Sequence, residues 1–128
     1  MPASPAFLTC CGLRGLLYTG LETSSPRVVQ AMHWLNEHAQ IDVNPGYDQR
    51  GYYTYLLGFA RTMRACEVAG ADFTNTAKLR DWRNLVTAEL LKRQTGLGQW
   101  RKGERDWWEN NPELITAYAI FTLSNTLL

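Results

Sequence analysis

Residues 92–100, KRQTGLGQW, decide how the fold of this chain is read. Apolar residues recur at helical spacing up to Gln94, and two glycines and a tryptophan follow in the next six residues. The Gln94 side chain can hydrogen-bond a backbone group that the end of a helix leaves unpaired. Gly96 and Gly98 permit a tight path, and Trp100 can bury its ring while its N–H finds a partner. The segment therefore predicts a connection that ties one helix to the next in a repeating helical protein.

Helical spacing of apolar residues extends over most of the chain, and no segment reads convincingly as a strand. Serine before proline, an Asn-Pro-Gly triplet and isolated glycines separate the helical segments. The pattern predicts about five helices, at residues 8–19, 26–38, 52–68, from between 76 and 81 to 94, and from 112 onward. The chain is therefore predicted to be all-α.

The predicted helices alternate in character. The first, third and fifth are rich in small or uncharged residues, whereas the second and fourth are amphipathic. A helix that is apolar on most of its surface is expected to be buried, and one with a polar face is expected outside. Alternation of buried and exposed helices is what two layers of antiparallel helical hairpins would produce, and such self-similarity is typical of repeat architectures.

The totals describe one ordinary folded domain, and we expect residues 1–128 to form it. The net charge of +1 gives no electrostatic reason to expect nucleic acid or an anionic membrane as a partner. No apolar run approaches the roughly 18 residues of a membrane span, and no basic residue precedes the first apolar stretch as in a secretory signal. The compartment stays unknown, with a cytoplasmic location as the default.

The three cysteines do not predict a disulfide framework or a metal site. Their number is odd, and Cys10 and Cys11 lie in an apolar helical segment where free cysteine behaves as a small hydrophobe. Together with Cys66 and the two histidines they offer none of the spacings that zinc sites use. We therefore expect neither a metal nor a cofactor.

The residues Gln94, Gly98 and Trp100 resemble the Gln-Trp repeat of squalene and oxidosqualene cyclases and their relatives. In those proteins a glutamine at the end of an outer helix and a tryptophan in the next turn tie consecutive repeats together. The segments NPGYDQRGYYTYLLGFARTM and WWENNPELITAYAIFTL look like the starts of inner helices in the same family. The resemblance covers residues from about 8 to 127 and is greatest to uncharacterised bacterial proteins with prenyltransferase and squalene-oxidase repeats.

The fold that this resemblance implies is a ring of six helical hairpins, an α/α toroid. The chain supplies only about two to three repeats, so we expect an incomplete toroid. Incomplete arrays leave apolar faces uncovered, which predicts either a homo-oligomer or the remainder of a larger toroid as the partner.

The catalytic motifs of the family are not matched by this chain. The acidic cluster of terpene cyclases is missing, since the aspartates lie singly among turns and helix starts. Glu109, Asn110 and Asn111 stand where prenyltransferases carry zinc ligands, and Leu13 and Arg14 follow Cys11-Gly12 where thioester toroids carry Glu-Gln. We therefore expect no catalytic residue in this chain.

Aromatic residues on the predicted inner helices are candidate ligand contacts. Aromatic faces in the cavities of cyclases stabilise carbocations, and phenols offer an apolar face with a polar tip. The alternative, which we favour, is that these rings fill the core and stitch the hairpins. The candidates are Tyr52, Tyr53, Tyr55, Trp107, Trp108 and Tyr118.

Three functions remain open at this point. The first is a noncatalytic repeat module that self-associates and offers a concave surface to a protein or an apolar ligand. The second is part of an isoprenoid or terpene enzyme whose catalytic acid lies outside this chain. The third is a peptide-binding helical solenoid of another family. We rank them in this order.

Overall fold

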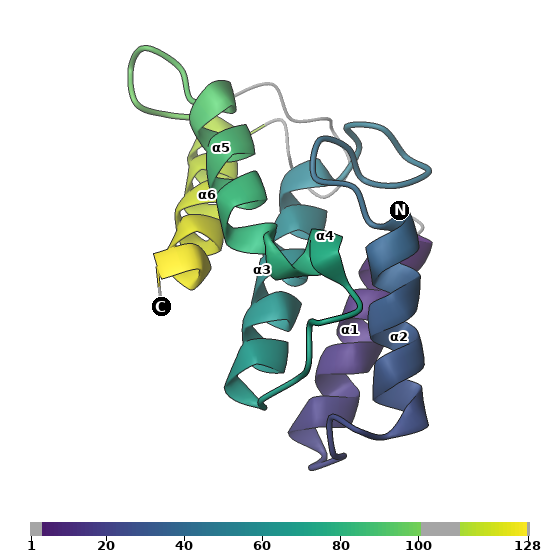
Figure 1. Ribbon diagram of the computed structural model, residues 1–128. Coiled ribbons are helices and arrows are strands. Elements are labelled where there is room, and N and C mark those ends of the chain that lie inside the picture. The colour runs from purple at the N-terminus through teal and green to yellow at the C-terminus, as the bar shows by residue number, and fades with distance from the viewer. Residues whose placement is uncertain (1–3, 101–110, 128) are drawn as a thin grey trace.

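The computed structural model describes residues 4–100 and 111–127, and this part of the chain folds into helices without any strand (Figure 1). The all-α prediction is therefore confirmed. The helices are α1 (Pro5–Tyr18), α2 (Pro26–His38), α3 (Tyr52–Val68), α4 (Ala77–Arg80), α5 (Trp82–Arg93) and α6 (Pro112–Leu127). None of the described helices is both long enough and apolar enough to span a membrane.

Local signals in the sequence set most helix ends. The Ser4 hydroxyl accepts a hydrogen bond of 3.0 Å from the Phe7 N–H, and α1 then starts at Pro5. Both α1 and α3 end at a glycine with positive φ, Gly20 at 89° and Gly70 at 81°. Each glycine and the residue after it donate to carbonyls in the last turn of their helix, in the same two-bond pattern. The two helices therefore share one type of C-terminal cap.

The predicted fourth helix is divided in two at Asp81, which the sequence analysis did not anticipate. The cause is a contact with α2, where the Asn36 Oδ1 accepts hydrogen bonds from the backbone N–H groups of Lys78 and Leu79 at 3.1 and 3.3 Å. The Lys78 ammonium in turn donates to the carbonyl of Ala39 just after α2. These bonds hold α4 at the end of α2, and α5 starts afresh with the fully buried Trp82.

The helices are arranged around α3. It packs between α1 and α6, while α2 packs on α1, and α5 packs on both α6 and α3 (Figure 1). Most of α3 is buried, including Leu56, Phe59 and Met63. Gly58 lets α1 approach closely, because a Cβ at this position would lie only 3.0 Å from the Phe7 ring. The core is therefore centred on α3.

The expectation that the first and fifth helices are buried like the third is wrong. In α1 and α6 only one stripe faces the core, and Leu8 on α1 and Phe121 on α6 are 58% and 59% exposed. The reason is position in the row that α1, α3 and α6 form, because α3 has a neighbour in this row on both sides, whereas α1 and α6 have one on one side only. The helices α2 and α5 each bury one face, as their amphipathic patterns predicted.

Candidate functional site

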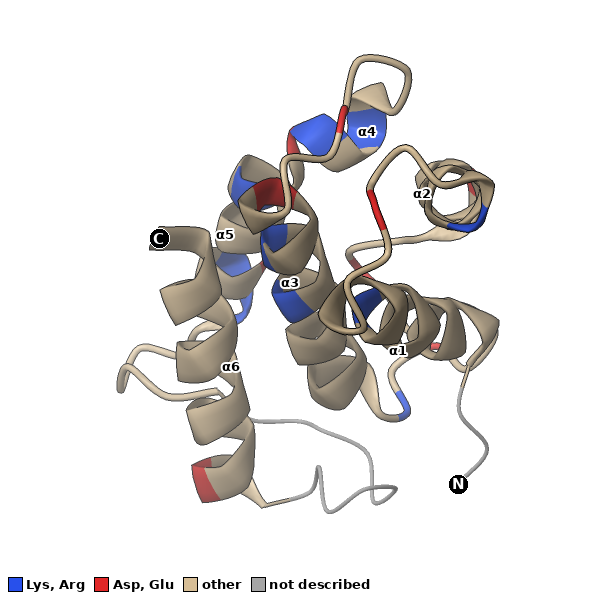
Figure 2. Ribbon diagram, turned by 90° about the horizontal axis from the view of Figure 1, so that it is seen from below, with Lys and Arg blue, Asp and Glu red and all other residues tan. Residues whose placement is uncertain are grey.

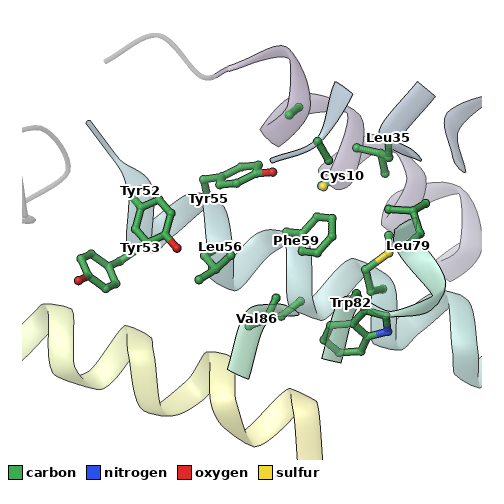
Figure 3. Packing of buried hydrophobic residues seen from close by; sticks show 14 of the residues in the cluster. Cys10, Leu35, Tyr52, Tyr53, Tyr55, Leu56, Phe59, Leu79, Trp82 and Val86 are labelled. Atoms are coloured by element: carbon green, nitrogen blue, oxygen red, sulfur yellow. The ribbon is translucent and has the colours of Figure 1, made fainter. Parts of the chain in front are cut away.

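The tyrosines at the start of α3 are buried and fasten the loop that precedes the helix. The Tyr52 hydroxyl donates to the Ile41 carbonyl at 2.5 Å, and the Tyr55 hydroxyl donates to the Gln40 carbonyl at 2.7 Å. The rings of Tyr52 and Tyr53 pack edge to face with centroids 5.1 Å apart (Figure 3). Burial raises the pKa of both the Tyr52 and Tyr55 hydroxyls well above the usual range of tyrosine, so they stay protonated donors.

The remaining candidate aromatic residues are distributed differently. Figure 3 shows the Tyr53 side chain pointing toward α6, the helix that carries Tyr118. Tyr118 is partly buried against the core. Trp107 and Trp108 lie outside the described residues. Since the hydroxyls of Tyr52 and Tyr55 are engaged with backbone carbonyls, a ligand-binding role for these aromatic residues stays a prediction.

Arg93 connects the same loop to the end of α5, and the sequence analysis gave it no role. Its guanidinium donates to Glu89 Oε1 at 2.8 Å, to Gln49 Oε1 at 2.7 Å and to the Asp42 carbonyl at 2.7 Å. The same group lies over the Tyr52 ring, 3.9 Å from its centroid. The only local signal in the sequence was that Arg93 is a basic residue in the last turn of a helix. This position predicts a favourable interaction with the helix dipole, but it does not predict a contact with a loop distant in sequence.

The segment from Gln94 to Trp100 forms a closed turn. Gln94 follows the last residue of α5, and its side-chain amide donates to the Gly98 carbonyl at 2.9 Å. Gly98 has a φ of 82°, and its N–H donates to the Thr95 carbonyl at 2.9 Å. Of the two glycines in the turn, only Gly98 uses the left-handed conformation that favours glycine.

Trp100, and not the Gln94 side chain, reaches back to the helix end. Its ring is 3% exposed, and its indole N–H donates to the Leu90 carbonyl in the last turn of α5 at 2.8 Å. Its backbone N–H donates to the Thr116 hydroxyl on α6 at 3.1 Å. One residue thus links the C-terminal turn of α5 to the first turns of α6. The expectation that Trp100 buries its ring and that its N–H finds a partner is confirmed. The expectation for the Gln94 side chain is wrong, because its amide closes the turn at Gly98 and does not bond a group at the helix end.

Two of the three cysteines are held as unreactive thiols. Cys10 and Cys66 are both fully buried, and burial raises the pKa of each thiol to about 12. Cys11 is partly exposed, and all three are free. Within the described ranges no group of three or more metal-binding side chains comes together.

At pH 8 a disulfide reagent is therefore expected to react rapidly with Cys11 alone in the native chain. Cys10 and Cys66 should react at least about a hundredfold more slowly, since the thiolate is the nucleophile and little of it forms. The measurement is the absorbance of the released thiol with and without denaturant, and Cys11→Ser is the control. A fast phase that survives in Cys11→Ser would contradict the assignment.

A groove lies where the C-terminal parts of α1 and α3 meet α6, and it was not anticipated from the sequence. Its volume is about 360 Å³. Its lining includes Arg61, Arg64 and Val68 of α3, together with Tyr18 of α1 and Asn125 of α6. Two arginines one turn apart on an otherwise weakly charged helix were the available signal.

Comparisons with known proteins found no match to this chain. No protein-family model matches the chain, no curated protein does, and no solved structure does. The likeness to squalene cyclase repeats therefore rests on the residues from Gln94 to Trp100 and on the helix pattern.

Proposed function

We propose that this chain is a noncatalytic helical repeat module of the squalene cyclase and prenyltransferase type. It consists of two to three hairpins of an α/α toroid, associates with further copies of itself, and offers a binding surface on its helices. The proposal rests on the arrangement of the helices, the turn at Trp100 and the apolar surface at both ends of the helix row.

The arrangement of the helices supports the repeat character. The row α1, α3 and α6 is formed by helices that alternate in the sequence with the outer helices α2 and α5. The shared C-terminal caps of α1 and α3 are what two copies of one unit would have. The link from the end of α5 through Trp100 to Thr116 is a contact of the kind that joins neighbouring repeats.

The proposal of self-association is based on apolar side chains that are exposed at the two ends of the row. On α6 the exposed fractions are 54% for Ile120 and 59% for Phe121, and on α1 the exposed fraction is 58% for Leu8. In a repeat array the next hairpin would cover such a surface, and an array without that hairpin can cover it with a second copy.

The use of the reactive side chains supports a noncatalytic role. The buried thiols of Cys10 and Cys66 stay protonated. The hydroxyls of Tyr52 and Tyr55 donate hydrogen bonds to backbone carbonyls of the loop before α3. Arg93, the most extensively bonded cation described above, is committed to the same loop. These groups stabilise the fold, and none of them is presented to a substrate.

Light scattering coupled to size exclusion tests the proposal. The full chain is expected to elute as a dimer or larger species at roughly tens of micromolar, a concentration above the micromolar Kd at the weak end of the range for standard-sized interfaces. The double variant Ile120→Ser/Phe121→Ser should shift toward the monomer, because it removes exposed apolar surface without touching the core. Leu97→Ser, at a side chain 81% exposed in the turn after α5, is the control and should keep the mass of the original chain.

A monodisperse monomer at high concentration, together with a cooperative thermal transition, would refute self-association. Equal masses for the double variant and the original chain would show that α6 is not the contact.

A further inference from the structure

We propose that the groove at the C-terminal ends of α1 and α3 binds an acidic amphipathic peptide helix. Two glutamates or aspartates of that helix, one turn apart, would pair with Arg61 and Arg64, and apolar residues beside them would cover Tyr18 and Val68. This inference rests on the proposed function, since it names the partner of a surface on the same module.

The two arginines of the groove carry charge that nothing described neutralises. Neither Arg61 nor Arg64 makes an ion pair or a side-chain hydrogen bond within the described residues, whereas Arg83 and Arg93 each bind a carboxylate. The nearest carboxylate along α3, Glu67, is held by Arg83 at 2.5 Å. No acidic residue is among the described residues that line the groove. Both arginines are at least partly exposed to solvent, so an occupant with carboxylates would gain ion pairs that the described chain does not already supply.

The helices on either side of α3 carry few charged residues that could interact with Arg61 and Arg64. Figure 2 shows basic positions on α3 between α1 and α6, which are almost free of charged residues. On α6 the only charged residue is Glu113 in the first turn, at the opposite end from Asn125 in the groove. On α1 the only charged residue is Arg14. Two cationic side chains therefore lie at the groove without a carboxylate from α1 or α6 beside them, although the chain as a whole is almost neutral.

The groove also presents apolar surface. Tyr18 and Val68 are 69% and 79% exposed at its edge, and Leu17 and Ala65 contribute to its lining. Apolar side chains that flank two cations favour a ligand with the complementary pattern, in which carboxylates sit beside aliphatic residues. An inorganic anion would satisfy the arginines and leave this apolar surface uncovered.

The spacing of the cations favours a helical peptide over a fatty acid or a membrane. Arg61 and Arg64 are three residues apart on one helix face, where Cβ atoms lie about 5–6 Å from each other. Two carboxylates three or four residues apart on a partner helix have the same spacing, whereas a fatty acid has one carboxylate. Basic membrane-binding surfaces carry roughly four to eight cations, more than the two in this groove.

A designed peptide tests this assignment on the full chain. The probe is a fluorescein-labelled, alanine-rich helix of roughly sixteen residues with two glutamates one turn apart and leucines on the same face. Fluorescence anisotropy should give a micromolar Kd. In Arg61→Gln/Arg64→Gln the affinity should fall by about tenfold or more. Arg27→Gln/Arg80→Gln, an equal loss of charge at exposed positions of α2 and α4, should leave it unchanged.

Charge exchange supplies a second, specific readout. The variant Arg61→Glu/Arg64→Glu should reject the glutamate peptide and bind the same peptide with lysines in place of the glutamates. Equal binding of the glutamate peptide to the original chain and to Arg61→Gln/Arg64→Gln would overturn the proposal. No binding of the labelled peptide at about 100 µM of the chain, well above a micromolar Kd, would overturn it as well.

Two further measurements separate the other occupants. Binding of phosphatidylserine vesicles that is lost in Arg61→Gln/Arg64→Gln, without peptide binding, would assign the groove to a lipid surface and overturn the peptide assignment. Light scattering of the same variant should show the mass of the original chain. A shift to monomer would place a second copy in the groove, which refutes the peptide while self-association stands.

Discussion

Replacing Trp100 with alanine is expected to lower the free energy of unfolding by about 3–5 kcal/mol, the usual cost of removing a buried large aromatic side chain. The ring is 3% exposed, so its loss leaves a cavity between α5 and α6. The indole hydrogen bond to the Leu90 carbonyl is lost as well. Urea denaturation followed by circular dichroism measures this difference in stability.

Two variants separate the contributions of Trp100. Trp100→Phe keeps most of the ring but removes the N–H, and it should cost only about 1–2 kcal/mol because the Leu90 carbonyl also accepts from the Gln94 N–H. Leu97→Ala, in the same turn but 81% exposed, should change stability by less than about 0.5 kcal/mol. If Trp100→Ala costs no more than Leu97→Ala, Trp100 does not hold the two helices together.

Hydrogen exchange gives the Trp100 prediction a local readout. Because the Trp100 N–H binds Thr116 in α6, amides of α6 should lose more protection in Trp100→Ala than amides of α1, which packs on the opposite side of α3. An equal loss of protection in α1 and α6 would show that the effect is global and that Trp100 is an ordinary core residue.

The starts of α2 and α6 and the ends of α1 and α3 could be predicted because their signals are local. Pro26 and Pro112 start helices, and Gly20 and Gly70 end them, in each case through conformational limits of one residue. The break at Asp81 could not be predicted, since it follows from Asn36, which lies more than forty residues away in the sequence. Sequence patterns carry no signal for a capping group supplied by another helix.

How far each apolar helix is buried could not be predicted from its hydrophobic periodicity. The patterns of α3 and α6 are both apolar, yet α3 lies in the middle of the row and α6 at its end. Which neighbour a helix has is a property of the tertiary arrangement, so the sequence could indicate an apolar helix but not how many of its faces are covered.

The candidate site was predictable only in part for a related reason. The tyrosines at the start of α3 could be recognised as aromatic and helical, but their hydroxyls are committed to carbonyls of residues 40 and 41, which only the path of the loop brings near. The pairing of Gln94 with Gly98 is local, whereas the contact of Trp100 with Thr116 crosses a helix boundary. That Arg61 and Arg64 lie together in a groove could not be predicted, because it depends on which described side chains of α1 and α6 are placed beside them.

Arg93→Ala is expected to destabilise the fold by about 2–3 kcal/mol, less than the cost of breaking a fully buried ion pair because this pair is only partly buried. The substitution removes three hydrogen bonds and the contact over Tyr52, and it leaves the carboxylate of Glu89, 15% exposed, without its cation. Lys92→Ala, the adjacent and exposed residue of equal charge, should stay within about 0.5 kcal/mol of the original chain. Denaturant titration measures both variants.

The source of the Arg93 effect can be resolved with a second substitution. If the unpaired carboxylate dominates, adding Glu89→Gln to Arg93→Ala should recover about 1 kcal/mol, because the neutral amide costs less to leave unpaired. If the loop contacts dominate, the double variant should stay as unstable as Arg93→Ala, and amides around the Asn44–Asp48 bridge should exchange faster in both. Arg93→Ala with the stability of Lys92→Ala would show that contacts other than Arg93 hold the loop, among them the Tyr52 and Tyr55 hydroxyls.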